Sequence, residues 1–213
     1  MAQAFSARAL LFTKLAAIGI AGLMTAGAVT AYEHFDGPYR VGDAPPQPIP
    51  FSHKHHVGDD GIDCRFCHGG VETSSFAGIP ATRICMTCHS QLFTDAPMLA
   101  PVRESAARNE PLHWTRVHRL PDFVYFDHSI HVRKGVGCVE CHGRVDRMPL
   151  MRRVAPLTMQ WCLDCHRDPA PHVRDPAHVF DMTPTPASRV AAGIPHEALA
   201  TRRRLTDCST CHR

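Results

Sequence analysis

All ten cysteines of this 213-residue chain belong to five copies of one pattern, Cys-x-x-Cys-His. The copies are Cys64-Cys67-His68, Cys85-Cys88-His89, Cys138-Cys141-His142, Cys162-Cys165-His166 and Cys208-Cys211-His212. One helical turn brings cysteines at i and i+3 to the same side, where both thiols can form thioethers with one macrocycle. The adjacent histidine then reaches the iron as its proximal ligand. The pattern predicts five covalently bound c-type haems, held by all ten cysteines and five motif histidines.

Two other uses of ten cysteines fit this pattern less well. A tetrahedral zinc site built from Cys-x-x-Cys needs two pairs, and five pairs do not divide evenly. A disulfide framework suits an even number of cysteines in an exported chain, but it gives no reason for a histidine to follow every second cysteine.

Composition predicts little regular secondary structure. There are 18 prolines in 213 residues, and proline interrupts both helices and sheets. Only 7% of the residues are aromatic, so we expect short helices that pack around the haems. The formal net charge of +3 omits the anionic haem propionates and says little about partners. The basic runs are short, so nucleic-acid binding is not expected.

The N-terminal residues 1–32 are predicted to be a membrane anchor. An apolar run extends from Leu10 to Tyr32, with Arg8 before it and acidic residues from Glu33 onward, which is typical of an exported N-terminus. Cleavage after Ala31 is the alternative. The length of the run and its small residues spaced four apart favour a retained helix. Residues 33–50 contain four prolines after Gly42 and are predicted to be an extended linker.

An internal repeat organises the remainder of the chain. The pattern Phe-x-His-x-x-His begins at Phe51 and again at Phe126, and each copy precedes two haem motifs with similar offsets. This agreement predicts two related modules, residues 51–92 and 120–170, joined by a connector at 93–119. The C-terminal segment 171–213 carries the fifth motif outside the repeat.

The histidines of the repeat are candidate distal ligands. Eleven of the sixteen histidines lie outside the motifs, against five distal positions on low-spin haems. Histidines at i and i+3 share one face of a turn, so each pair should serve two neighbouring haems. We therefore assign four irons to His53, His56, His128 and His131, and the fifth to His118. The alternatives for the fifth iron are His113, His172, His178, His196, Met148 and Met151.

Several of these segments resemble a known family. The runs Phe51 to His68, Arg116 to His131, Gly135 to Met151 and Trp161 to Arg167 are similar to the pentahaem cytochrome c subunit of bacterial alternative complex III. The resemblance covers roughly residues 51–168. It implies a multihaem cytochrome c with class III or c7-like modules: short helices around five haems and one N-terminal transmembrane helix. The histidine-bearing motifs of that family lie at His53, His56, His118, His128 and His131.

The resemblance also implies partners and a location. The family's other subunits are an iron-sulfur protein resembling molybdopterin oxidoreductases, polytopic quinol-site proteins and a monohaem cytochrome. Such a complex oxidises quinol in the bacterial cytoplasmic (inner) membrane, with the haem domain in the periplasm and a soluble cytochrome or terminal oxidase as acceptor. No nucleophile or acid-base constellation is evident, so we expect an electron carrier and not an enzyme. The rival interpretations are a stand-alone multihaem quinol dehydrogenase and a multihaem reductase with one open haem site.

Overall fold

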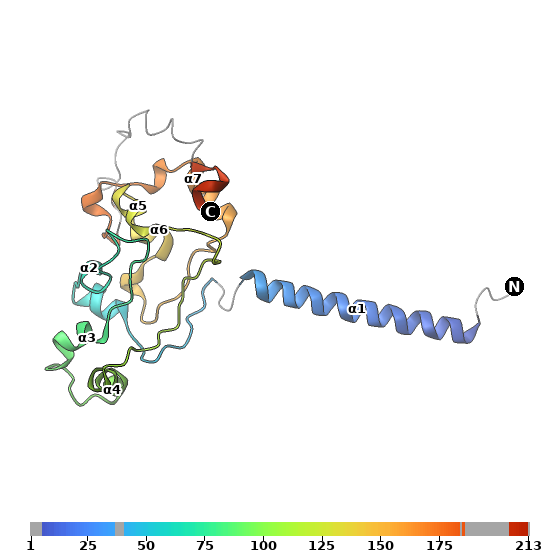
Figure 1. Cartoon of the computed structure of the whole chain (residues 1–213), viewed down its shortest axis with the longest axis horizontal. Coiled ribbons are helices and arrows are strands. Elements are labelled where there is room, and N and C mark those ends of the chain that lie inside the picture. The colour runs from blue at the N-terminus through green and yellow to red at the C-terminus, as the bar shows by residue number, and fades with distance from the viewer. Residues whose placement is uncertain (1–5, 37–40, 184, 186–204, 213) are drawn as a thin grey trace. The chain divides into compact units, whose positions relative to one another are not determined.

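The computed structural model describes residues 6–36, 41–183, 185 and 205–212, and it divides the chain into two compact units. The first is residues 1–40 and the second is residues 41–213. Figure 1 shows the first as one helix and the second as a series of short elements around α2 to α7. Each unit is described by itself.

The N-terminal unit is the helix α1, Ala7–Asp36. Its stretch Ala7–Tyr32 has 26 residues, a mean hydropathy of 1.8 and no buried share. At about 1.5 Å per residue it exceeds the roughly 30 Å hydrocarbon core of a bilayer. The hydroxyls of Thr13, Thr25 and Thr30 donate to carbonyls four residues earlier, which satisfies them without water. By length and composition, α1 can cross a membrane.

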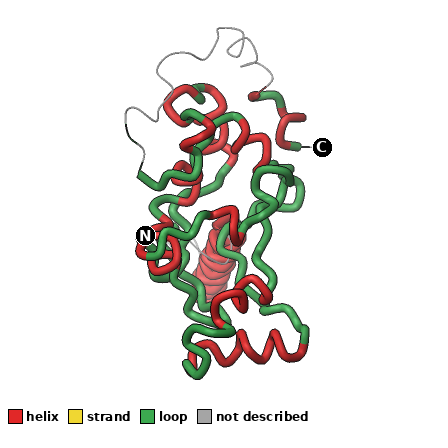
Figure 2. Tube along the Cα trace, turned by 90° about the vertical axis from the view of Figure 1, so that its left-hand side faces the viewer, coloured by secondary structure: helices red, strands yellow, loops and turns green. Residues whose placement is uncertain are grey.

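The second unit consists of short helices joined by loops. Its α-helices are α2 (Cys64–Cys67), α3 (Thr82–His89), α4 (Ala100–Arg108), α5 (His128–Arg133), α6 (Cys138–His142), α7 (Met159–Arg167) and α10 (Cys208–Cys211). A π-helix, η1, spans Lys54–Asp59, and 3-10 turns lie at η2 (Pro97–Leu99), η3 (Val145–Arg147), η4 (Ala170–His172) and η5 (Pro176–His178). Figure 2 shows helices and loops but no strand in the described part of the chain. The low content of regular structure predicted from the prolines is confirmed.

Local capping explains where several of these helices begin. The carboxylate of Asp63 accepts from the backbone N–H of Arg65 before α2, and that of Asp127 accepts from Ile130 N–H at the start of α5. The hydroxyl of Thr158 accepts from Trp161 N–H at the start of α7. A side-chain acceptor at this position satisfies an N–H group that has no partner within the helix.

The protein interior of this unit is small. Among the described residues, eight hydrophobic side chains are buried: Ile49, Val71, Val102, Val132, Met148, Ala155, Val179 and Met182. Large apolar side chains near the haem motifs are instead exposed, among them Phe66, Ile79, Leu92, Phe93, Phe123 and Met159. A domain of this length normally buries about two thirds of its surface on folding. These apolar surfaces are therefore suited to pack against haem.

The proline-rich segment predicted as a linker packs against the haem unit from Val41 onward. Gln47 and Thr115 exchange hydrogen bonds of 2.9 Å between the Gln47 amide and the Thr115 backbone. The Thr115 hydroxyl donates to Pro46 O, and Gly42 N–H donates to Arg153 O. Proline favours extended backbone with free carbonyls, and here the connector and the second module bind it. The segment from Val41 onward is therefore bound to the haem unit through these long-range contacts, whereas its prolines predicted an extended spacer.

Candidate haem-binding sites

Each of the five motifs lies on a short helix. The cysteine pairs lie on α2, α3, α6, α7 and α10, one pair per helix, so each pair has the i, i+3 spacing that places two thiols on one side. All ten thiols are free. Thioether attachment to a haem therefore requires no disulfide to be broken.

The motif histidines are oriented by backbone carbonyls. The Nδ1 atoms lie 2.7 Å from Gly78 O in His68, 3.2 Å from Leu92 O in His89, 2.8 Å from Leu205 O in His166 and 3.0 Å from Phe123 O in His212. A ring whose Nδ1–H donates to a carbonyl keeps Nε2 unprotonated and available to a metal. Four of the five proximal histidines are thus prepared to bind iron through Nε2.

The two copies of the repeat have the same side-chain geometry. The Phe51 ring lies edge-on to His53 at 4.9 Å and stacks on His56 at 4.5 Å. The corresponding distances from Phe126 are 4.8 Å to His128, again edge-on, and 4.4 Å to His131. The shared phenylalanine therefore fixes the orientation of both histidines that follow it.

Carbonyls also orient the candidate distal histidines. The second histidine of each pair bonds back one turn: His56 Nδ1 lies 2.9 Å from Ser52 O, and His131 Nδ1 lies 2.7 Å from Asp127 O. His128 Nδ1 lies 2.9 Å from Ser75 O. As in the proximal histidines, Nε2 is left for iron.

Three pairs of histidine rings have the separation expected across an iron. Metal–imidazole bonds of about 2 Å, as for zinc, on opposite faces of one metal place the ring centroids about 6 Å apart. The observed separations are 6.1 Å for His56 and His89, 6.1 Å for His131 and His166, and 6.4 Å for His128 and His142. The donor set therefore fits haem with two histidine ligands, from the second, third and fourth motifs.

Buried imidazoles gather around His142. Burial lowers the pKa of His142 to about 3, with a further contribution from His118 and His128. Burial also lowers the pKa of His53 to about 4, assisted by neighbouring His68, and that of His118 to about 4. Two buried ring nitrogens, His53 Nδ1 and His118 Nε2, have no hydrogen-bond partner. Neutral imidazoles with an unpaired nitrogen are suited to bind a metal.

The ring contact of His118 is with the third motif. The His118 ring is 4.4 Å from the ring of His142, in a T-shaped arrangement. The ring contact of His212 is with Phe123, at 5.8 Å. Among the described residues, no ring contact joins His212 to a second histidine. The structure thus brings His118 to the third motif, whereas the sequence interpretation paired it with the fifth haem.

Thiols of different motifs influence the pKa values of one another. Burial is the first cause that raises each pKa, to about 12 for Cys138 and Cys141. The largest additional contributions are from Cys64 on Cys138 and from Cys165 on Cys141. Two further pairs of motifs are related in this way: Cys85 raises the pKa of Cys67, and Cys211 raises the pKa of Cys162.

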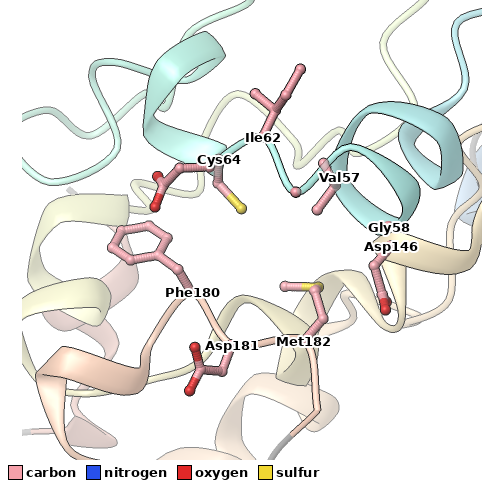
Figure 3. A pocket seen from close by; sticks show the side chains of 10 residues that line it. Val57, Gly58, Ile62, Cys64, Asp146, Phe180, Asp181 and Met182 are labelled. Carbon is pink, nitrogen blue, oxygen red and sulfur yellow. The ribbon is translucent and has the colours of Figure 1, made fainter.

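An open cleft lies at the first motif. It has a volume of about 300 Å³ and is lined by Cys64 of α2, by Val57 and Gly58 of η1, and by Phe180 and Met182 from the C-terminal segment. Figure 3 shows the Cys64 sulfur directed into this space, with Phe180 and Met182 on the facing side. Phe180 and Met182 offer apolar contacts to a haem attached at Cys64, and Asp63, Asp146 and Asp181 also line the cleft.

Comparison with known proteins agrees with this geometry. Residues 124–213 match the family model "Cytochrome c7 and related cytochrome c", a stretch that contains α5, α6, α7 and α10 and therefore three of the five motifs. This part of the chain is similar to c7-like multihaem cytochromes c. Covalently bound haem is the cofactor that the similarity implies.

A curated relative is similar over a longer stretch of the chain. The multihaem cytochrome c subunit of menaquinone reductase from Nitratidesulfovibrio vulgaris (strain Hildenborough) is 36% identical over 133 residues. The match covers 62% of this chain and 57% of the relative. The chain therefore spans just over half the length of that protein.

A buried ion pair that the sequence did not reveal joins the C-terminal segment to α6. The guanidinium of Arg174, of which 2% is exposed, donates to Glu140 at 2.8 Å. His172 Nδ1 lies 3.0 Å from the other oxygen of the same carboxylate. Glu140 lies between the cysteines of the third motif, so this cytochrome ties residues 172–174 to a haem attachment helix. A glutamate inside a Cys-x-x-Cys pair is the sequence feature that could have indicated this ion pair.

The remaining candidates for the fifth iron lie in varied surroundings. Met148 is 1% exposed and packs within the protein core, whereas Met151 is half-buried. His178 Nδ1 lies 2.7 Å from Asp181 Oδ2. His113 is exposed, and His196 lies outside the described residues.

Proposed function

We propose that this cytochrome is the electron-transfer subunit of a membrane complex that oxidises quinol, of the alternative complex III kind. It carries five c-type haems and passes electrons to a soluble cytochrome or a terminal oxidase. The observation that carries the proposal is the set of histidine ring pairs at 6.1, 6.1 and 6.4 Å. An iron with two axial histidines has no position left for a substrate. We infer that the second, third and fourth haems transfer electrons only, and we propose that the chain as a whole is an electron carrier.

The chain's residues hold and tune the cofactors. The cysteine pairs fix each haem by two thioethers, and the carbonyl-bound histidines set the axial direction. When bound, each haem supplies an iron that exchanges one electron. The side chains determine its potential through axial ligand, burial and hydrogen bonding. Burial lowers the pKa of His142, His118 and His53 to about 3, about 4 and about 4, which keeps their imidazoles neutral at neutral pH.

The partners follow from the proposal. We infer an iron-sulfur subunit resembling molybdopterin oxidoreductases, polytopic quinol-site subunits and a monohaem cytochrome. The helix α1 would anchor the chain in the cytoplasmic membrane, with the haem unit in the periplasm.

A second candidate function reverses the direction of electron flow. The curated relative is a subunit of a menaquinone reductase, so the same haem arrangement could deliver electrons to a quinone. In the first function quinol reduces the haems. In the second, a periplasmic donor reduces them and the haems reduce the quinone.

Isolation of the native complex from membranes tests both candidates. We expect mass spectrometry to find an iron-sulfur subunit and polytopic quinol-site subunits with this chain, and added quinol to reduce the haems. Reduction by a periplasmic donor but not by quinol would favour the menaquinone reductase function. A chain purified without partners yet reduced by quinol would indicate a stand-alone dehydrogenase. A five-coordinate high-spin haem would indicate a reductase.

A further inference from the structure

We propose that the five haem attachment sites form one row in the order second, first, third, fourth, fifth. The second and fifth sites are then its ends. The inference rests on the proposed function, since it concerns the same haems, and it adds which sites are neighbours. Its basis is the set of contacts by which the surroundings of one motif hold a histidine of the next.

The first and second sites share the helical turn that carries His53 and His56. The His56 ring lies 6.1 Å from His89 of the second motif. The backbone after His56 leads directly into the first motif: Ile62 N–H donates to His56 O at 2.9 Å, and Val57 and Cys64 line the same cleft. One turn of chain therefore serves both sites, which makes them neighbours.

The loop after the first motif joins it to the third. Gly78 O lies 2.7 Å from His68 Nδ1, and three residues earlier Ser75 O lies 2.9 Å from His128 Nδ1. The backbone N–H of Ser129 donates to Ser74 O in the same loop. This loop thus orients the proximal histidine of the first site and a histidine of the third.

Side-chain packing supports the same junction. Val71, from that loop, belongs to a buried cluster with Val132 of α5 and Val179, and Cys138 of the third motif packs against the cluster. The two repeated modules therefore meet through their first sites.

The third and fourth sites share helix α5. His128 lies 6.4 Å from His142 of the third motif, and His131, one turn later, lies 6.1 Å from His166 of the fourth motif. This arrangement repeats the one that joins the first and second sites.

The fourth and fifth sites are joined by the backbone before α10. His166 Nδ1 lies 2.8 Å from the carbonyl of Leu205, three residues before Cys208. Cys211 O accepts from Tyr125 N–H, and Phe123 O lies 3.0 Å from His212 Nδ1. The fifth motif is therefore held between the fourth site and the segment that leads into α5.

The exposure of the thiols identifies the ends independently. Of the ten cysteines, Cys88 of the second motif and Cys208 of the fifth are exposed, and the other eight are half-buried. An interior site is covered on two sides by its neighbours, whereas an end site is covered on one. The second and fifth sites are thus the positions open to partner proteins.

Two matched ligand variants of the full-length holoprotein test the order. His56→Met and His131→Met change equivalent positions of the repeat, and methionine in place of histidine raises the potential of the haem concerned. The altered haem is then already reduced when the neighbouring haems are titrated. Its reduced iron carries one positive charge fewer, so the midpoint potentials of the neighbouring haems fall.

The readout is an EPR-monitored redox titration that follows each low-spin haem. We expect the end-site variant, His56→Met, to lower the midpoint of one other haem and the interior variant, His131→Met, to lower two. If His56→Met shifts two haems or His131→Met shifts one, the proposed order is wrong. Where a variant does not fold, Cys85→Ser/Cys88→Ser and Cys162→Ser/Cys165→Ser provide the same comparison, with one and two shifted midpoints.

Reduction of the haems by quinol, measured on membranes that contain the same variants, separates this inference from the proposed function. If quinol does not reduce the haems but His56→Met shifts one midpoint and His131→Met shifts two, the proposed function is wrong and the haem order stands. If quinol reduces the haems normally but the numbers of shifted midpoints differ, the haem order is wrong and the proposed function stands.

Discussion

Arg174 is a buried cation that joins the C-terminal segment to the third haem motif. Its guanidinium bonds the carboxylate of Glu140 at 2.8 Å and the carbonyl of Asp181 at 3.1 Å. Two glycines make room for it: a Cβ on Gly137 would lie 2.3 Å from the guanidinium, and one on Gly135 would lie 2.2 Å from Arg174 O. The local backbone is thus shaped around this side chain.

Replacing Arg174 with alanine should destabilise the holoprotein. The change leaves the Glu140 carboxylate, 23% exposed, without its cation, and loss of one partner of a buried pair costs about 3 kcal/mol. Thermal unfolding followed by haem absorbance measures the effect. Arg167→Ala is the matched control, because its pair with Asp164 is exposed and worth less than about 1 kcal/mol. Equal losses for the two variants would contradict the structural role of Arg174.

The Asp146 carboxylate should contribute to stability in a pH-dependent way. Hydrogen bonding by Arg144 holds the pKa of Asp146 below its usual value. A lowered folded-state pKa gives stability that is present above the unfolded pKa, about 3.9, and is lost as the pH falls through the folded value. Asp146→Asn should be less stable than the wild type at pH 6, and the difference should diminish as the pH falls below the unfolded value. Denaturant unfolding across this range measures it, and a constant difference would show that the charge is not responsible.

At the scale of elements, η1 and η3 pack closely because Gly58 lacks a side chain. A Cβ at Gly58 would lie 2.2 Å from the carbonyl oxygen of Asp146. Lys54 N–H also donates to Met148 O across the same junction. The π-helix η1 carries His56, so its docking on η3 positions a candidate ligand of the second haem.

The variant Gly58→Ala should therefore disturb the second haem. The overpacked junction is expected to cost about 1–3 kcal/mol and to shift His56 away from His89. A fraction of one haem should become high-spin in the visible and EPR spectra. Gly69→Ala serves as the control, because its nearest contact would be an ordinary 3.8 Å. If both variants keep wild-type spectra, η1 docking does not hold the ligand.

The local elements of this fold were predictable, and their long-range contacts were not. Five motifs and the Phe-x-His-x-x-His repeat identified the attachment helices and both histidine pairs, because spacing alone determines which side chains share a turn. The position of His118 beside His142 depends on how the connector 93–119 crosses the second module. The docking of Gln47 on Thr115 and the burial of Arg174 likewise join segments remote in sequence. The spacing of residues along the sequence carries no information about such contacts.

For the whole molecule, the small protein interior implies that haem completes the core. Eight buried hydrophobic side chains in the described part of the chain are few for a unit that begins at Val41. The helix α1 belongs to a separate unit, so its removal should leave the haem unit folded.

Deletion of residues 1–32 should release the haem unit from membranes unless partner subunits retain it. The apolar stretch Ala7–Tyr32 is long enough to provide the anchor. Fractionation of membranes, with haem staining of each fraction, measures the release. Pull-down of the truncated protein separates retention by partners from retention by lipid. A truncated protein that stays in membranes without any partner would contradict the anchor assignment.

We propose that the chain carries five covalent haems, each with two axial ligands. The most direct measurement combines intact-protein mass spectrometry with EPR of the full-length oxidised protein. We predict a mass greater than that of the polypeptide by five haems and spectra from low-spin iron alone. A smaller covalent count, or a high-spin signal from one haem in every molecule, would contradict it.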